Sequence, residues 1–232
     1  MRPAIVKEQK QLKMSSVYQW GNPTNNEYTH SKPQYDPVQK SEYIAPRCVI
    51  GLDRDGVLNI DRGTYTWKIE DFVPIENSLE AVSRLRQLGH KIAIITNQGG
   101  IEKGQFTERD VEMLHQHMLD LLGNAGCPSI DAIYYSASSR KTDEWAKPNI
   151  GMFKLCEREY PHIKFSKGFY VGDKITDLKA AIKIGAKPVL VRTGYGIETE
   201  KELKKFTYRD IKKKAIVFDD LNSFVDWIEA QY

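Results

Sequence analysis

Two aspartates that are two residues apart follow directly on a short apolar stretch, and their spacing suits them for chemistry. Cys48 to Leu52 is apolar, and Asp53 and Asp55 come next, closed by Gly56. Such a stretch with a turn signal at its end predicts a buried strand. Like charges this close raise each other's pKa unless a cation lies between them, and a hard divalent ion such as Mg²⁺ suits oxygen ligands. An ordinary Asp-Gly turn explains the same residues, and this stretch alone leaves both interpretations open.

Polar groups also follow three later apolar stretches. If Cys48 to Leu52 is counted as the first stretch, Thr96, Asn97, Gln98 and Gly99 close the second. Lys147 lies in the loop after the third, and Asp173, Lys174 and Asp177 follow the fourth. Because the carboxyl ends of parallel strands meet at one edge of a sheet, we expect these groups to lie together. Singly, each has another explanation, since Gly-Asp before a helix is also an ordinary cap. Four such ends in order favour a site for phosphate chemistry.

Strands and helices alternate along the chain from residue 48, which predicts an α/β fold with a mostly parallel central sheet covered on both faces. The expected strands are 48–52, 91–96, 132–135, 169–171, 188–191 and 216–218. Helices are expected to begin at Asn77 and Thr107, to cover 151–160, to end at Ile184, and to cover 221–230. His115 and His117 are two residues apart, so they point to different faces of their helix. We expect them to be surface or packing residues rather than metal ligands.

The composition limits the classes of function. The chain has 232 residues and a net charge of +3, which is enough for one α/β domain and too weakly basic for a nucleic-acid footprint. The run Lys212 to Lys214 is expected to be a solvated helix end or loop. Three separated cysteines without a CxxC pattern indicate reduced thiols of a cytoplasmic protein. No apolar run approaches the ~20 residues of a membrane span, and no secretory signal is present, so we expect no membrane partner.

Residues 1–47 differ from the rest of the chain. Gln, Asn, Lys, Pro, Ser and Tyr dominate them, with no helical or strand periodicity. We expect a polar extension, disordered or draped on the domain that covers 48–232, and Met14 is an alternative start. Its aromatic residues leave open a second interpretation, a segment that docks on the domain or on a partner.

The order of the motifs resembles the haloacid dehalogenase superfamily of phosphohydrolases over residues 48–193. Within it, the chain is similar to the branch that holds the heptose 1,7-bisphosphate phosphatases and histidinol-phosphate phosphatases. The motifs that carry the resemblance are Asp53-Arg54-Asp55-Gly56, Thr96-Asn97-Gln98, Lys147-Pro148, Gly172-Asp173-Lys174 and Val191-Arg192-Thr193-Gly194. The resemblance implies a three-layer α/β/α Rossmann-like fold with a small flap at 59–73 and no large cap domain. It also implies a phosphatase for a small phosphorylated metabolite, such as a sugar phosphate.

The resemblance also assigns roles to residues. Asp53 would be the nucleophile that forms an aspartyl-phosphate, and Asp55 the general acid and base. Mg²⁺ would be held by Asp53, the backbone carbonyl of Asp55, and Asp173. Thr96, the N–H of Asn97 and Lys147 would bind the phosphoryl group, with Asp177 in support. Further positions match substrate contacts of the family, namely Asp61, Arg62, Gly63, Thr64, Gln98, Gly99 and Lys174.

The chain departs from its resemblance in two places that bear on the substrate. Residues 136–146 contain neither Cys nor His, so we expect no structural zinc. Ala146 stands where relatives often place an Arg before the Lys, although Arg140 or Lys141 could replace it. Two other functions remain open: a phosphatase for nucleic-acid ends, which would need a basic groove, and a non-catalytic interaction module. Nucleic acid is not the expected partner, and a monomer is expected.

Overall fold

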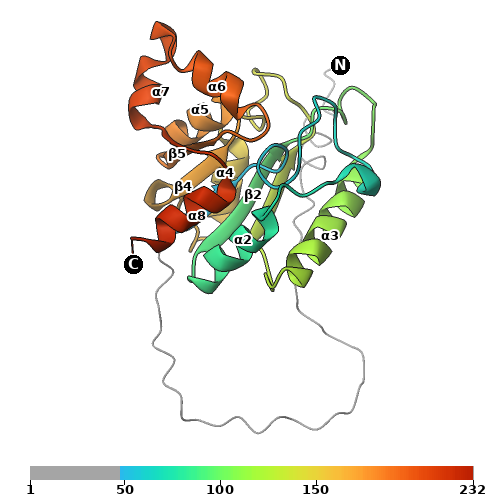
Figure 1. Ribbon diagram of the computed structural model, residues 1–232. Coiled ribbons are helices and arrows are strands. Elements are labelled where there is room, and N and C mark those ends of the chain that lie inside the picture. The colour runs from blue at the N-terminus through green and yellow to red at the C-terminus, as the bar shows by residue number, and fades with distance from the viewer. Residues whose placement is uncertain (1–47, 232) are drawn as a thin grey trace, which may run out of the picture.

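Six parallel strands form a single sheet in the order β3-β2-β1-β4-β5-β6 (Figure 1). The computed structural model describes residues 48–231, so the predictions made for residues 1–47 lie outside the described residues. The strands are β1 (Val49–Leu52), β2 (Lys91–Asn97), β3 (Ala132–Ser136), β4 (Phe169–Gly172), β5 (Lys187–Val191) and β6 (Ile216–Phe218). The mostly parallel sheet expected from the sequence is confirmed, since every neighbouring pair runs in the same direction.

The order of the strands reverses beside β1. The chain passes from β1 to β2 and β3 on one side, then returns so that β4 pairs with the other side of β1. The loops that leave β1 and β4 therefore diverge to opposite faces of the sheet. In open α/β sheets the crevice at such a switch point is where ligands bind. The residues that follow Leu52 and Gly172 flank this crevice.

Helices cover both faces of the sheet and make the three layers that were expected. They are α2 (Ser78–Gln87), α3 (Glu108–Asn124), α4 (Gly151–Glu159), α5 (Ile175–Ile184), α6 (Gly196–Glu202), α7 (Arg209–Lys214) and α8 (Leu221–Glu229). In β2, Ile92 and Ile94 pack with α2, α3 and α8, whereas Ala93 and Ile95 pack with α4 and α5. This alternation is the period of two that a strand with two buried faces requires.

The segment between β1 and α2 is a short flap rather than a domain. Its start and end are held together, because Ile60 N–H donates to Val73 O and Ile75 N–H donates to Leu58 O, each at 2.9 Å. The flap contains a single 3₁₀ turn, η1 (Ile69–Asp71). Two further 3₁₀ turns lie elsewhere, η2 (Phe165–Lys167) and η3 (Phe206–Tyr208). Within residues 48–231, no helix has the length and apolar character that crossing a membrane requires.

Most predicted elements are confirmed, and the exceptions have local causes. Thr107 caps α3 with the predicted reciprocal bonds to Asp110. Asn77 does precede α2, but it adopts a left-handed conformation with φ 59° and its side chain makes no capping bond. Helices α6 and α7 were not predicted. They are short, and α7 buries none of its residues, so neither carries the apolar stripe by which a helix is recognised.

Candidate active site

Three buried carboxylates meet at the switch point between β1 and β4. Asp53 follows β1, and its N–H donates to Val171 O in β4 at 2.9 Å. Asp173 follows β4, and Asp177 lies in the first turn of α5. One oxygen from each of the three acids lies within 4.8 Å of the others, and all three residues are buried. The sequence prediction that segments far apart in the chain bring these acids together is confirmed.

Lys147 supplies the counter-charge inside this cluster. Its Nζ lies 2.9 Å from Asp53 Oδ1 and 2.7 Å from Asp177 Oδ1, and only 2% of its side chain is exposed. The Lys147 ammonium also donates to Tyr170 Oη at 2.9 Å, and Tyr170 donates to Ile95 O at 2.6 Å. Sequence reasoning did not identify Tyr170, because an aromatic residue in an apolar strand is typical of a core.

The Asn97 side chain positions Lys147. Its Oδ1 accepts from the Lys147 N–H at 2.9 Å, and its Nδ2 donates to the Lys147 carbonyl at 3.0 Å. The end of β2 therefore fixes the loop that follows β3. The contact of the Asn97 backbone N–H with a phosphoryl group stays a prediction, and the structure shows in addition that the Asn97 side chain holds the Lys147 backbone.

The cluster carries more negative charge than Lys147 neutralises. Burial raises the pKa of Asp173 to about 8, and the charges of Asp177 and Asp53 add to this effect against the attraction of Lys174. Burial also raises the pKa of Asp53, although Lys147 opposes it. For Lys147, burial alone would lower the pKa, but the charges of Asp177 and Asp53 outweigh it and raise the pKa.

A divalent cation fits this arrangement. Asp173 Oδ1 is buried and accepts no hydrogen bond from any residue that the structure describes. A buried carboxylate oxygen without a donor is costly unless a proton or a cation reaches it. Hard cations such as Mg²⁺ take carboxylate oxygens as ligands. The backbone carbonyl of Asp55 is also a predicted ligand. The cluster of side-chain carboxylates does not test it, so this ligand stays a prediction.

The Asp55 carboxylate accepts hydrogen bonds from three side chains. Arg54 Nη2 donates to its Oδ2 at 2.8 Å, Asn59 Nδ2 to its Oδ1 at 3.0 Å, and Gln98 Nε2 to its Oδ2 at 3.0 Å. Burial would raise the pKa of Asp55, but the Arg54 charge and these hydrogen bonds outweigh burial and lower it. These hydrogen bonds hold the Asp55 carboxylate in one orientation.

Arg54 is a residue of the site whose role sequence reasoning missed, and His115 packs against it. The Arg54 side chain is fully buried, although it carries a charge. Its guanidinium donates to Thr66 O in the flap at 2.8 Å, and its Nη1 lies 3.3 Å from His115 Nε2. Burial, and then the Arg54 charge, lower the pKa of His115 to about 3, so this imidazole is neutral. The prediction that His115 is a packing residue is confirmed, and its place beside Val111 and Met118 on the apolar face of α3 was the available signal.

Comparisons with known proteins agree with this geometry. A family model described as "Polynucleotide kinase 3 phosphatase" matches residues 49–215. The D-glycero-beta-D-manno-heptose-1,7-bisphosphate 7-phosphatase of Pseudomonas aeruginosa is 33% identical over 175 residues, which cover 75% of this chain and 94% of that protein. The chain belongs to the haloacid dehalogenase superfamily. It is a phosphoric monoester hydrolase of the kind that the superfamily resemblance predicted.

Solved structures support the same placement in the superfamily. The D,D-heptose 1,7-bisphosphate phosphatase of B. bronchiseptica, complexed with magnesium and phosphate, aligns with a TM-score of 0.72 and 28% identity. The alignment covers 80% of this chain and 99% of that one. A putative HAD-like phosphatase of Mesorhizobium loti aligns with a TM-score of 0.56 and 25% identity, over 63% of this chain and 74% of that one.

Two glycines of the superfamily motifs make room for Asp173. Gly56 has φ +87° and Gly194 has φ +56°, which are left-handed conformations that favour glycine. A Cβ atom at either position would lie 2.2 or 2.3 Å from Asp173 Oδ2. The same oxygen accepts the Tyr195 N–H at 2.9 Å. The loops after β1 and β5 therefore enclose Asp173 through their backbones alone.

Some of the predicted substrate-binding residues make contacts within the site, and others are exposed on the flap. Thr96 accepts from Gln98 Nε2 at 3.0 Å beside Asp55, and Lys174 pairs with Asp61 of the flap at 2.9 Å. Gly99 packs against Ser139, so close that a Cβ would meet Ser139 Oγ at 2.2 Å. Arg62, Gly63 and Thr64 are exposed on the flap, and their contacts with a substrate remain predictions.

Proposed function

We propose that the chain is a Mg²⁺-dependent phosphatase that hydrolyses a phosphomonoester of a small metabolite, a sugar phosphate such as a heptose bisphosphate. The observation that carries this proposal is the buried cluster of Asp53, Asp173 and Lys147 at the switch point of the sheet. The relatives support the substrate class, because they are named as heptose bisphosphate phosphatases. The free cysteines of the described residues agree with a cytoplasmic location.

Asp53 acts as the nucleophile in this proposal. Its Oδ1 is occupied, since Lys147 lies 2.9 Å away and the Arg54 N–H donates to it at 2.8 Å. Oδ2 is therefore the oxygen that we expect to attack phosphorus. The Oδ2–P bond forms as the bond from phosphorus to the leaving oxygen breaks, which gives an aspartyl-phosphate and a free sugar hydroxyl.

Asp55 moves the proton in both halves of the reaction. It protonates the leaving oxygen in the first half, then takes a proton from the water that attacks the aspartyl-phosphate. Phosphate leaves, and Asp53 returns to its carboxylate. Thr96, the Asn97 N–H and Lys147 hold the phosphoryl oxygens and stabilise the charge that develops on them. A Mg²⁺ ion held by Asp53, the Asp55 carbonyl and Asp173 would neutralise carboxylate and phosphoryl charge.

The decisive experiment compares different substrates, the presence and absence of Mg²⁺, and the wild type with a variant of Asp53. Phosphate release is measured from a heptose bisphosphate, histidinol phosphate and a 3′-phosphorylated oligonucleotide, with Mg²⁺ and with a chelator in excess. We expect the sugar phosphate to be hydrolysed with the highest kcat/KM, only with Mg²⁺, and not by Asp53→Asn. Turnover by folded Asp53→Asn at the wild-type rate, or turnover that survives chelation, would refute the mechanism.

A second candidate function is supported by the matching family model. Its description, "Polynucleotide kinase 3 phosphatase", makes the 3′-phosphorylated oligonucleotide an informative member of the panel. If the oligonucleotide has the highest kcat/KM, the chemistry stands and the substrate class changes. If a folded protein releases phosphate from none of the substrates at any Mg²⁺ concentration, both proposed substrate classes are refuted.

A further inference from the structure

Basic residues gather on one corner of the domain, formed by α6, η3 and α7. Residues 201–214 contain seven lysines and arginines and two acidic residues, whereas residues 48–232 as a whole carry equal numbers of each. The net charge of the rest of the domain is therefore negative, and it equals in size the positive net charge of residues 201–214. The net charge of +3 is carried by residues 1–47, since residues 48–232 are neutral overall, so this group of basic residues stands out within a neutral domain. We call residues 201–214 the basic corner.

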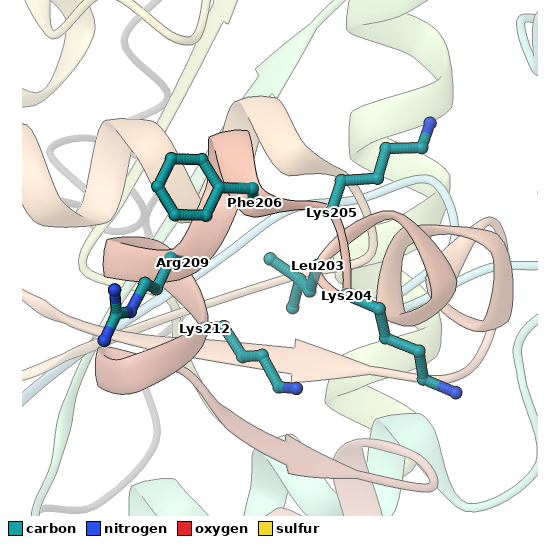
Figure 2. Close-up of a pocket in the computed structure, with 6 residues that line it drawn as sticks. All are labelled: Leu203, Lys204, Lys205, Phe206, Arg209 and Lys212. Atoms are coloured by element: carbon teal, nitrogen blue, oxygen red, sulfur yellow. The ribbon is translucent and has the colours of Figure 1, made fainter.

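Four cations of the basic corner line the same hollow, with their charged ends pointing in different directions around it (Figure 2). The hollow has a volume of about 230 Å³ and is lined by Leu203, Lys204, Lys205, Phe206, Arg209 and Lys212. Leu203 is buried and forms the apolar base of the hollow, while the charged side chains spread around it. No acidic residue lines the hollow, although Lys205 Nζ lies 3.6 Å from Glu202 Oε1. This face is thus built to meet negative charge.

Phe206 projects from the same face. Its side chain is 84% exposed, more than any other large hydrophobic side chain in residues 48–231, where the next, Ile197, is 49% exposed. It lies in the turn η3 between the two short helices, directly after Lys204 and Lys205. An aromatic side chain that stands out between lysines is suited to the boundary between lipid headgroups and acyl chains.

We propose that the basic corner docks the protein on lipid bilayers that contain anionic lipid, with Phe206 inserted at the level of the headgroups. Clusters of four to eight lysines and arginines attract the negative surface of a bilayer, and a nearby apolar side chain supplies the second anchor that stable binding needs. The cations that line the hollow would pair with phosphates of neighbouring lipid headgroups. This surface binding requires no membrane-spanning helix, and it differs from the expectation, made from the sequence, that no membrane is a partner.

Other occupants fit the corner less well. Residues 1–47 carry seven basic and four acidic residues, so they share its sign of charge. Protein interfaces are depleted of lysine, which dominates here. A nucleic-acid strand needs a groove that follows several phosphates and aromatic side chains for several bases, whereas the hollow offers one projecting ring.

Sedimentation of the full-length protein with vesicles tests the proposal. The vesicles are phosphatidylcholine alone, or phosphatidylcholine mixed with phosphatidylglycerol. We expect binding to the mixed vesicles only, with binding lost at high salt because ions screen the attraction. Phe206→Ser should weaken binding by about tenfold, the lower end of what burying a phenylalanine gives. The double variant Lys204→Glu, Lys205→Glu should abolish it.

Matched variants on another face serve as controls. Lys164→Glu with Lys167→Glu changes the same charge at two exposed lysines, and Met113→Ser removes an exposed apolar side chain. Both should bind as the wild type does, and circular dichroism and phosphatase turnover should be unchanged in all variants. Equal binding to both vesicle types, no vesicle binding, or full binding by the basic-corner variants would overturn the proposal. So would tighter binding of a single-stranded oligonucleotide, or of soluble glycerol phosphate, that the same variants abolish.

Discussion

The Lys147 ammonium nitrogen lies 2.9 Å from Oδ1 of Asp53, and both side chains are buried. This contact joins the loop after β3 to the end of β1, two segments that are 94 residues apart in the sequence. The same ammonium reaches Asp177 at 2.7 Å, so one cation faces two buried anions. We therefore expect Lys147 to have two tasks, to stabilise the folded state and, in the proposed mechanism, to leave a single oxygen of Asp53 available for attack.

Replacing Lys147 by Met should impair both stability and turnover. Two carboxylates would then be buried without their cation, a loss that costs about 3–5 kcal/mol of unfolding free energy. The transition state would also lose a positive charge, which lowers kcat by about 10² or more. Urea unfolding without Mg²⁺ and steady-state kinetics with Mg²⁺ measure the two effects. Lys141→Met, at an exposed lysine in the same loop, should change neither, and an unchanged kcat in Lys147→Met would contradict the assignment.

The role of Asp55 as an acid should show in the identity of the leaving group. An alkyl phosphate needs a proton on its leaving oxygen, whereas a nitrophenyl phosphate needs little help because its phenolate is stable. Asp55→Asn should therefore lower kcat/KM, which reports the first half of the reaction, by about 10²–10⁴ for the alkyl substrate and far less for the aryl substrate. Equal losses for both substrates would show that Asp55 does not protonate the leaving group.

Arg54 should act through Asp55. A change at Arg54 should therefore also lower kcat/KM more for the alkyl phosphate than for the aryl phosphate, but by a smaller factor. Arg54 donates to both carboxylate oxygens of Asp55 and also to Thr66 O. A lysine ammonium cannot reproduce this forked contact. Arg54→Lys should lower kcat/KM by about tenfold for the alkyl phosphate, the factor of one lost charged hydrogen bond, and less for the aryl phosphate. Arg109→Lys, at an exposed position of α3, is the control. A loss that is independent of the leaving group would mean that Arg54 only supports the fold.

The sequence allowed the strands and the acids of the site to be predicted, because both depend on local patterns. An apolar stretch closed by a polar turn identifies a strand end, and parallel strand ends share an edge, so Asp53 and Asp173 could be placed together. Tyr170 and Arg54 could not be identified in this way. Their function depends on contacts with Lys147 and with Thr66 and His115, which only the folded chain brings near. Helix α7 was missed because its lysines face solvent.

The flap should contribute to substrate affinity through Asp61. Its carboxylate lies 2.9 Å from Lys174 Nζ, and this ion pair ties the flap to the loop after β4. The Lys174 side chain is 37% exposed, so solvent weakens the pair to ~1 kcal/mol at most. Asp61→Asn should raise KM by up to about fivefold with a smaller change in kcat, as that free energy allows. Glu70→Gln, an exposed acid of the same flap, should leave both unchanged, and a fall in kcat alone would contradict this role.

His115 should make the folded protein less stable in mild acid. Its pKa is about 3 in the folded state, because of burial and the Arg54 charge, against an ordinary value of 6.5. Below about pH 6.5 the unfolded chain binds a proton at this residue that the folded chain does not, so stability is full above that pH and falls as the pH falls towards 3. The loss from this residue between about pH 7 and pH 5 should be about 2 kcal/mol. Urea unfolding across this range measures it against His115→Gln, which retains a polar side chain beside Arg54 and does not titrate. The slope of stability with pH should be smaller in the variant by that amount, and identical slopes would mean that His115 already binds its proton in the folded state.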